Sequence, residues 1–159
     1  MKRTEGTPVS SRRILSKLLC AARTVIKSMR LEEGQLIVSV APREGQSCRC
    51  PYCGREAPIH DCLPSPRHWR AVDLGSTMTF IEYATLRVDC PEHGVVVASV
   101  PWAHHASRFT DAFEEQTAWL CMHCNHGVVA ELMRIDWKSV GPVCRSPGPL
   151  RRVHQHRDR

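Results

Sequence analysis

Aromatic residues and long hydrophobic runs are both scarce in this 159-residue sequence. Phenylalanine, tryptophan and tyrosine make up 6% of it, so stacking platforms for single-stranded nucleic acid are not favoured. No apolar run approaches the ~20 residues that a membrane span needs, which argues against a membrane as partner. The short apolar run at residues 14–20 is interrupted by Lys17 and does not make a secretory signal. We therefore expect a cytoplasmic protein.

Cysteine, by contrast, is abundant, with nine residues in the chain. The odd count rules out complete internal pairing, and thiols stay reduced in the cytoplasm. Clustered cysteines in a reduced chain indicate metal binding before disulfides. A chain of this length builds one ordinary domain or two very small ones, and small modules often need a metal to be stable.

Positive charge predominates over negative charge. The formal net charge is +6 at pH 7 with neutral histidine, and the isoelectric point is about 9.0. This balance favours a polyanionic partner, although a solvated basic surface would give the same composition.

The first part of the chain changes its hydrophobic period. Residues 1–24 predict a polar tail followed by a helix, because the apolar residues between Ser10 and Ala22 follow helical spacing. Apolar residues on either side of Glu33-Gly34 then predict two strands joined by a tight turn. A longer helix through Met29 is the alternative.

Residues 25–103 are predicted to form a β-rich domain. Between Met78 and Val88 the side chains alternate, with Met78, Phe80 and Val88 on one face and Thr79 on the other. This period of two predicts a single strand. Residues 95–100 predict the strand that pairs with it.

A pattern of ligand, proline, any residue, ligand and glycine occurs twice, at residues 50–54 and 90–94. Two ligands separated by two residues reach one ion from a tight turn. Proline presets φ for that turn, and glycine tolerates the positive φ with which the chain leaves it. Two such turns supply a closed tetrahedron, so the Zn²⁺ is expected to be structural, with reduced turn cysteines without metal as the alternative. The predicted ligands are Cys50, Cys53, Cys90 and His93.

The other cysteines carry weaker signals. Cys48 stands two residues before Cys50 and could replace it as a ligand. Cys121 and Cys124 share the Cys-x-x-Cys spacing, and a second metal site there is the alternative to two small apolar groups on a helix. No partner at a useful spacing is found for Cys20, Cys62 and Cys144.

Residues 107–145 are predicted to form a helix-turn-helix. One helix starts at Thr110 or Asp111, a second covers residues 128–133, and Asp136 caps a third. In such a unit the last helix enters the major groove with its first residues at the base edges, and nearby basic residues hold phosphates. The predicted DNA-binding residues are Arg134, Trp137, Lys138, Ser139 and Arg145.

The third helix has one residue that anchors it and one that opposes it. Val140 is expected to pack against Val129 and Leu132. Pro142 removes a helix hydrogen bond and clashes with the preceding turn, at a cost of ~3 kcal/mol. We therefore expect this helix to be kinked or short.

Further motifs follow the pattern at residues 50–54 in a fixed order along the chain. They lie at residues 67–75, 87–95, 100–103, 107–114 and 129–137. With Cys-Pro-x-Cys-Gly before them, they resemble the start of transposases of the ISL-three insertion-sequence family. The match runs from about residue 50 to residue 143, and more loosely back to residue 25.

The resemblance implies an α+β chain, with a small β-rich zinc ribbon followed by an all-α helix-turn-helix that binds the terminal inverted repeats of its element. Trp137 to Val140 would begin the recognition helix. In the family a following ribonuclease-H-like domain cuts DNA with an Asp-Asp-Glu triad. That triad is expected to fall beyond this chain, so no enzymatic activity is expected. Residues 146–159 depart from the family as a basic, disordered tail and indicate a truncated or frameshifted copy.

Three functions are compatible with these residues. The first is sequence-specific binding of double-stranded DNA in the nucleoid. The second is a zinc-ribbon protein–protein adapter that associates with its own copies or with a full-length transposase. The third is a zinc hydrolase or thiol enzyme, which would need an open zinc position or an activated thiol that the sequence does not mark. DNA binding should weaken steeply with salt, and an adapter should not.

Overall fold

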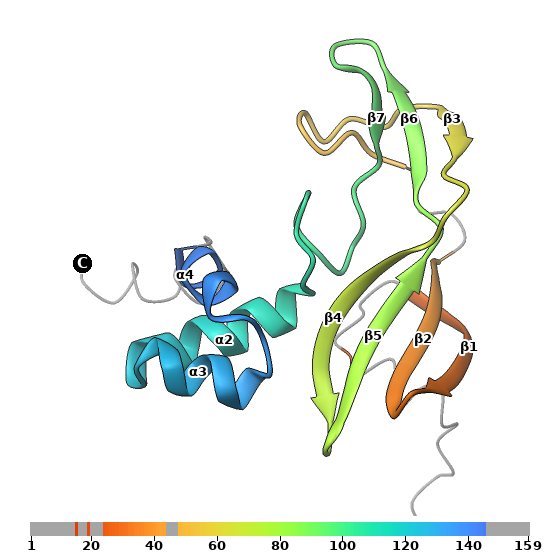
Figure 1. Ribbon diagram of the computed structural model, residues 1–159. Coiled ribbons are helices and arrows are strands. Elements are labelled where there is room, and N and C mark those ends of the chain that lie inside the picture. The colour runs from red at the N-terminus through yellow and green to blue at the C-terminus, as the bar shows by residue number, and fades with distance from the viewer. Residues whose placement is uncertain (1–14, 16–18, 20–23, 44–47, 146–159) are drawn as a thin grey trace, which may run out of the picture.

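The computed structural model describes Leu15, Leu19, residues 24–43 and residues 48–145 (Figure 1). Apart from those two leucines, the predicted N-terminal helix lies outside the described residues, as does the tail from residue 146. The four-stranded sheet has the order β1-β2-β5-β4, with β1 at Thr24–Glu32, β2 at Gln35–Pro42, β5 at Thr77–Tyr83 and β4 at Arg67–Leu74.

A second sheet and three helices complete the described part of the chain. The three-stranded sheet has the order β3-β6-β7, with β3 at Ile59–Cys62, β6 at Leu86–Cys90 and β7 at Gly94–Val97. The helices are α2 (Asp111–His123), α3 (His126–Met133) and α4 (Trp137–Arg145).

The strands and helices are segregated along the chain, which confirms the predicted α+β class. In Figure 1 the helices lie on one side of the four-stranded sheet, and the three-stranded sheet extends from its upper end. Strands β2 and β5 are parallel, and the other paired strands are antiparallel. None of the described helices combines the length and the apolar character needed to cross a bilayer.

The turn at Glu33-Gly34 confirms the two predicted strands against the alternative of a long helix. Glu33 has φ 49° and Gly34 has φ 75°. Positive φ at both central residues is the geometry of the two-residue hairpin turn, whose twist matches that of the flanking strands. Strands β1 and β2 pair on either side of it from Glu32 opposite Gln35 to Thr24 opposite Pro42.

The prediction of a single strand from Met78 to Val88 is wrong. The chain crosses from one sheet to the other at residues 84–85, so its first half is β5 and its second half is β6. Thr79 and Ile81 are fully buried, and so is Val88, which lies in the opposite phase of the alternation. A period-two pattern cannot reveal such a change, because the crossing reverses which side chains face inward.

The main core lies on the four-stranded sheet. Trp69 of β4 is 1% exposed and meets Trp102 edge to face, with 5.6 Å between ring centroids. Tyr83 meets the same indole edge to face at 5.4 Å. Leu19 joins this cluster from the N-terminal segment. The loop that carries Trp102 is thereby fixed against the sheet before the chain enters α2.

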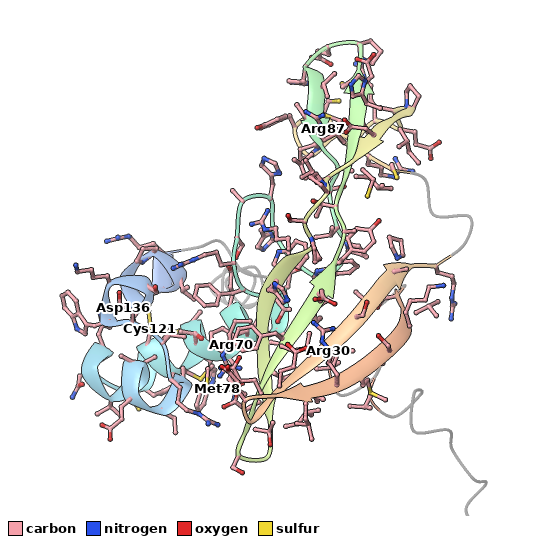
Figure 2. The ribbon with its side chains drawn as sticks, turned by 45° about the vertical axis from the view of Figure 1, so that its right-hand side comes forward. Arg30, Arg70, Met78, Arg87, Cys121 and Asp136 are labelled. Atoms are coloured by element: carbon pink, nitrogen blue, oxygen red, sulfur yellow. A yellow bond between two sulfur atoms is a disulfide. The ribbon has the colours of Figure 1, made fainter. Side chains whose placement is uncertain are left out.

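The helical unit is docked onto β4 through backbone and side-chain contacts. The Arg70 amide donates to the Arg108 carbonyl at 2.9 Å, and the Thr110 amide donates to the Arg70 carbonyl at 3.0 Å. The buried Arg70 guanidinium forms an ion pair with Asp73, which also pairs with Arg134 at the end of α3. Figure 2 shows Arg70 between the sheet and the helices. These contacts set where the helices stand relative to the β-rich part.

Glu82 on β5 carries a pH-dependent part of the stability. Arg30 donates to its two carboxylate oxygens at 2.8 and 2.7 Å, and His68 lies 3.1 Å away. The hydrogen bonds from Arg30 hold the pKa of the Glu82 carboxyl below its usual value. A carboxyl with a lowered folded-state pKa stabilises the fold fully above the unfolded pKa of ~4.3, and loses that contribution as pH falls through the folded value.

We therefore expect Glu82→Gln to lower the free energy of unfolding at pH 7, and the difference from the parent to shrink as pH falls below ~4. Urea denaturation of both proteins between pH 7 and 3 measures this difference, and any zinc loss at low pH affects the two alike. A difference that stays constant with pH would contradict the expectation.

Candidate zinc site and nucleic-acid interface

Each of the two repeated motifs forms a tight turn. In the first, the Gly54 amide donates to the Cys50 carbonyl at 3.0 Å, and Gly54 has φ 71°. The second closes the hairpin between β6 and β7, where Cys90 is paired with Gly94, whose φ is 68°. Both glycines adopt the left-handed conformation that the motif predicted, because it returns the chain out of the turn without a Cβ clash.

The two turns meet, although Cys53 and Cys90 are 37 positions apart in the sequence. Their sulfur atoms are 3.7 Å apart, and Nδ1 of His93 is 3.7 Å from the Cys50 sulfur and 3.6 Å from the Cys90 sulfur. All four ligand atoms lie within 4.8 Å of one another. A zinc tetrahedron has edges of ~3.8 Å between sulfurs and ~3.6 Å between sulfur and nitrogen, from its usual bond lengths. The observed spacing therefore fits Zn²⁺, and the thiolate and imidazole donors suit it chemically.

The surroundings of the sulfurs favour their charged form at two positions. Burial raises the pKa of the Cys50 thiol, but hydrogen bonds from backbone N–H groups of its own turn and with the Cys53 and Cys90 thiols together outweigh burial, so the net direction is downward. The pKa of Cys90 is lowered, first by His93. A backbone N–H from Arg55 lowers the pKa of Cys53, yet burial and the two other thiols outweigh it and the net direction is upward. N–H donors aimed at sulfur orient thiolate ligands around a metal.

The cluster is enclosed on one side and open on the other. Cys50 and Cys90 are each 1% exposed, and His93 is exposed. The Tyr52 ring packs against His93 with 5.3 Å between centroids, and against His105 of the loop before α2 at 5.1 Å. Cys48 is not part of this group of four side chains and Cys50 is, so the geometry favours Cys50 of the two candidates.

The three predicted helices are present, and side chains cap their starts. Thr110 accepts from the Phe113 amide at 3.3 Å at the start of α2. Asn125 does the same for α3, with the Val128 amide at 3.0 Å. Asp136 precedes α4, and its side chain accepts from the Lys138 amide at 3.3 Å. These side chains satisfy amides that the first helical turn leaves without partners.

The core of the helical unit differs in one residue from the prediction. Val140 is fully buried and packs in a cluster with Phe113, Val129 and Met133. Leu132, which was expected in that place, is 60% exposed. The spacing allowed either neighbour to face inward, and the crossing of α4 over α3 selects Met133.

Helix α4 turns its first residues away from this core. Trp137 is 64% exposed, and Lys138 is exposed beside it. Ser139 accepts a hydrogen bond from Arg108 at 3.3 Å, a contact that no sequence pattern indicated. The helix continues through Pro142 to Arg145, so of the two expected effects of the proline, a kink or an early stop, the early stop is wrong.

The two arginines that were expected to hold phosphates have different surroundings. Arg134 has a left-handed backbone, with φ 51° and ψ 49°, at the turn between α3 and α4. Its guanidinium donates to the Ser76 carbonyl at 2.9 Å and pairs with Asp73, so its described contacts are within the protein. Arg145 lies exposed at the end of α4.

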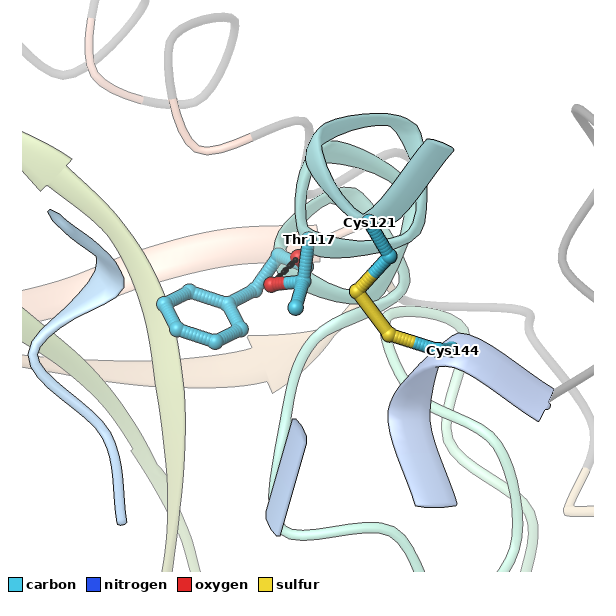
Figure 3. The surroundings of a disulfide bond; sticks show 4 residues. Thr117, Cys121 and Cys144 are labelled. Carbon is cyan, nitrogen blue, oxygen red and sulfur yellow. Dashed lines mark hydrogen bonds between the residues drawn. A yellow bond between two sulfur atoms is a disulfide. The ribbon is translucent and has the colours of Figure 1, made fainter. Parts of the chain in front are cut away.

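Cys144 has a partner that the sequence did not indicate. It forms a disulfide with Cys121 of α2, with the two Cα atoms 6.2 Å apart (Figure 3). The partners are 23 residues apart, so no local motif marks the pair. His126 lies within 4.8 Å of both sulfur atoms. Cys124, the other half of the Cys-x-x-Cys spacing, is exposed and stands outside this group.

Comparison with known proteins matches these two regions separately. A family model described as the zinc-finger of transposase IS204/IS1001/IS1096/IS1165 matches residues 46–93. A model described as the helix-turn-helix domain of transposase family ISL3 matches residues 98–144. No solved structure matches the chain.

Two curated relatives extend the comparison to most of the sequence. Both are described as the transposase for insertion sequence element IS1557, from Mycobacterium tuberculosis strains CDC 1551 / Oshkosh and H37Rv. Each is 41% identical over 127 residues, which is 76% of this chain and 29% of the relative. The chain thus spans less than a third of their length. It carries the zinc-ribbon and helix-turn-helix regions of the ISL3 transposase family.

Proposed function

We propose that this chain binds double-stranded DNA in the nucleoid and recognises the terminal inverted repeats of an insertion sequence. The observation that carries the proposal is the orientation of α4: Val140 and Val143 are buried, while Trp137 and Lys138 of its first turn are exposed. A helix held in this way presents its N-terminal residues to base edges in a major groove. The net charge of +6 supports a polyanionic partner.

Within this proposal, α4 supplies both kinds of contact. Trp137, Lys138 and Ser139 face the bases, and Arg145 holds a phosphate. Arg134 orients α4, since its guanidinium already binds Asp73, and it adds a phosphate contact only if DNA competes for that pair. Arg108 keeps Ser139 in place.

The proposal also assigns a structural Zn²⁺ to Cys50, Cys53, Cys90 and His93. The tetrahedral spacing of their ligand atoms supports this assignment, as does the match to a zinc-finger model. Four protein ligands leave no position for water or substrate, so the ion acts on folding and not on chemistry.

We further propose that this chain by itself does not cut DNA. Among residues 24–43 and 48–145, the groups of three or more ligand side chains are the zinc cluster and Cys121, His126 and Cys144, and neither contains a carboxylate. Metal-assisted cleavage of phosphodiesters relies on carboxylates that hold divalent ions. Nicking of supercoiled plasmid by the zinc-loaded chain in magnesium or manganese would contradict this.

Lys138→Ala is expected to reduce the preference for the element's repeat over a scrambled duplex by roughly 5- to 150-fold, the range for one base contact of ~1–3 kcal/mol. Arg145→Ala is expected to weaken both duplexes alike and to reduce the slope of log affinity against log salt by about 1. Fluorescence anisotropy titrations of the zinc-loaded proteins measure both quantities.

The matched control is Lys27→Ala, an exposed lysine on β1 away from α4. It should leave the preference unchanged. Equal affinity of the parent for the repeat and the scrambled duplex would overturn sequence-specific recognition.

A protein–protein adapter is the second candidate, favoured by exposed apolar side chains on α2 and α3. Their exposed fractions run from 47% to 60%. Apolar side chains of this kind mark contacts between proteins when they are contiguous. The partner would be a second copy of the chain or a full-length transposase, and binding would change little with salt. The residues are Trp119, Met122, Val128 and Leu132.

A further inference from the structure

Helix α4 is weak by its own sequence. Gly141 and Pro142 stand in the middle of its nine residues, and these are the two poorest helix formers. Pro142 also removes the amide that would bond to the Lys138 carbonyl one turn earlier. Only Val140 and Val143 of the helix are buried. The turn that follows the proline therefore depends on contacts from outside the helix.

The disulfide supplies such a contact at the required place. Cys144 lies two residues after Pro142, and its bond to Cys121 ties the last turn of α4 to α2 (Figure 3). Helix α2 is itself well anchored, because Thr110 caps its start and Phe113 packs in the core with 1% of its surface exposed. The bond thus holds the segment that the proline would release.

We propose that Cys121 and Cys144 form a reversible thiol–disulfide site that orders α4 and thereby sets its affinity for DNA. The effect on affinity rests on the proposed function, in which α4 meets the duplex. Both residues are half-buried, so a small reagent can reach them. A chain in the reducing cytoplasm would alternate between the two states as the thiol pool changes.

The oxidant in this thiol–disulfide exchange is a low-molecular-weight disulfide such as oxidised glutathione. A thiolate of the pair attacks it, releases one glutathione thiol and leaves a mixed disulfide. The second protein thiolate then displaces the other glutathione and forms the Cys121–Cys144 bond. The two protein thiols lose two electrons and two protons, and the reagent becomes two thiols.

His126 makes zinc binding by the reduced cysteine pair the alternative to the disulfide. Its ring nitrogen lies within 4.8 Å of both sulfurs, so the reduced pair and this imidazole make a three-ligand group of the kind that binds Zn²⁺. Zinc held there would join the same helices without a disulfide. Metal stoichiometry of the reduced protein separates the two arrangements, since the ribbon accounts for one equivalent.

The test uses the full, zinc-loaded chain in buffers with different ratios of reduced to oxidised glutathione. We expect hydrogen exchange at residues 137–145 to accelerate on reduction. We expect affinity for the repeat duplex to fall about tenfold if reduction leaves α4 formed in one molecule in ten. Cys121→Ser/Cys144→Ser should remain at the reduced-state values in every buffer, and Cys62→Ser, which removes an exposed cysteine of β3, should keep the full response.

The site is overturned by exchange in α4 that is identical in both redox states, or by a second zinc equivalent in the reduced parent. A redox response that persists in the double serine variant would also exclude it and would point to the ribbon cysteines. If neither form binds the duplex while exchange still responds, the site stands as a device that orders α4, and the proposed function fails instead.

Discussion

Cys90→Ser is expected to abolish stoichiometric zinc binding and to unfold the three-stranded sheet while the four-stranded sheet persists. Cys90 is 1% exposed and contacts two other ligands. Apart from the ligand cysteines, the buried apolar residues of this part are Val88 and Ala98. So small a core cannot order the strands, and a structural zinc contributes apparent free energies of ~10–16 kcal/mol in comparable modules. Serine oxygen is a poor replacement for thiolate on this ion.

Cys62→Ser is the matched control, because Cys62 is an exposed cysteine at the end of β3 that stands outside the ligand group. Metal content by atomic emission and the dispersion of amide resonances measure both variants. The control should bind one zinc and keep the parent spectrum. A folded Cys90→Ser protein with one zinc per chain would contradict the assigned ligands, and chelation of the parent should reproduce the variant's spectrum.

The cluster of Cys50, Cys53, Cys90 and His93 could be predicted because its information is local. Each of the two repeated motifs contains two candidate ligands, a tight turn and the glycine that ends it within five residues. The repetition of the pattern links two segments that are far apart in sequence. The same holds for the caps of α2 and α4 and for the turn at Glu33-Gly34, where one or two residues decide the backbone. Short-range stereochemistry needs no knowledge of the remaining fold.

What the sequence did not reveal depends on partners distant in the chain. The change of sheet at residues 84–85 reverses the buried phase without a glycine or proline to mark it. Cys144 finds Cys121 only because α4 packs over α2, and Arg134 finds Asp73 only because the helices dock on the β4–β5 hairpin. The choice of Met133 over Leu132 follows from the same packing. These outcomes belong to tertiary geometry, which periodicity does not encode.

Asp73→Asn is expected to destabilise the whole chain and to loosen the helical unit from the sheet. Asp73 is the carboxylate shared by Arg70 and Arg134, whose side chains are 6% and 41% exposed. The Arg134 pair contributes little because solvent screens it. Arg70 decides the size of the effect, since loss of one partner leaves a buried charge and typically costs ~3–5 kcal/mol.

Two features of the Arg70 environment place the expected cost toward ~3 kcal/mol, the lower end of that range. Its guanidinium also donates to the Ala71 carbonyl at 2.7 Å and to the Thr79 carbonyl at 3.3 Å. It lies over the rings of Phe80 and Phe113, at 5.4 and 5.2 Å, which favours a cation there. These contacts remain in the variant and retain part of the stabilisation. Even the smaller value is a large share of the ~5–15 kcal/mol that stabilises an ordinary domain.

Asp61→Asn gives the matched comparison, because it removes the carboxylate of another Asp–Arg pair whose side chains are 40% and 39% exposed. An exposed pair is worth ~0–1 kcal/mol, so this variant should unfold close to the parent. Urea denaturation of the zinc-loaded proteins measures both, and amide exchange at residues 108–110 reports the docking onto β4 directly. If Asp73→Asn and Asp61→Asn cost the same, Arg70 does not depend on its carboxylate, and the aromatic rings and carbonyls alone hold the helical unit on the sheet.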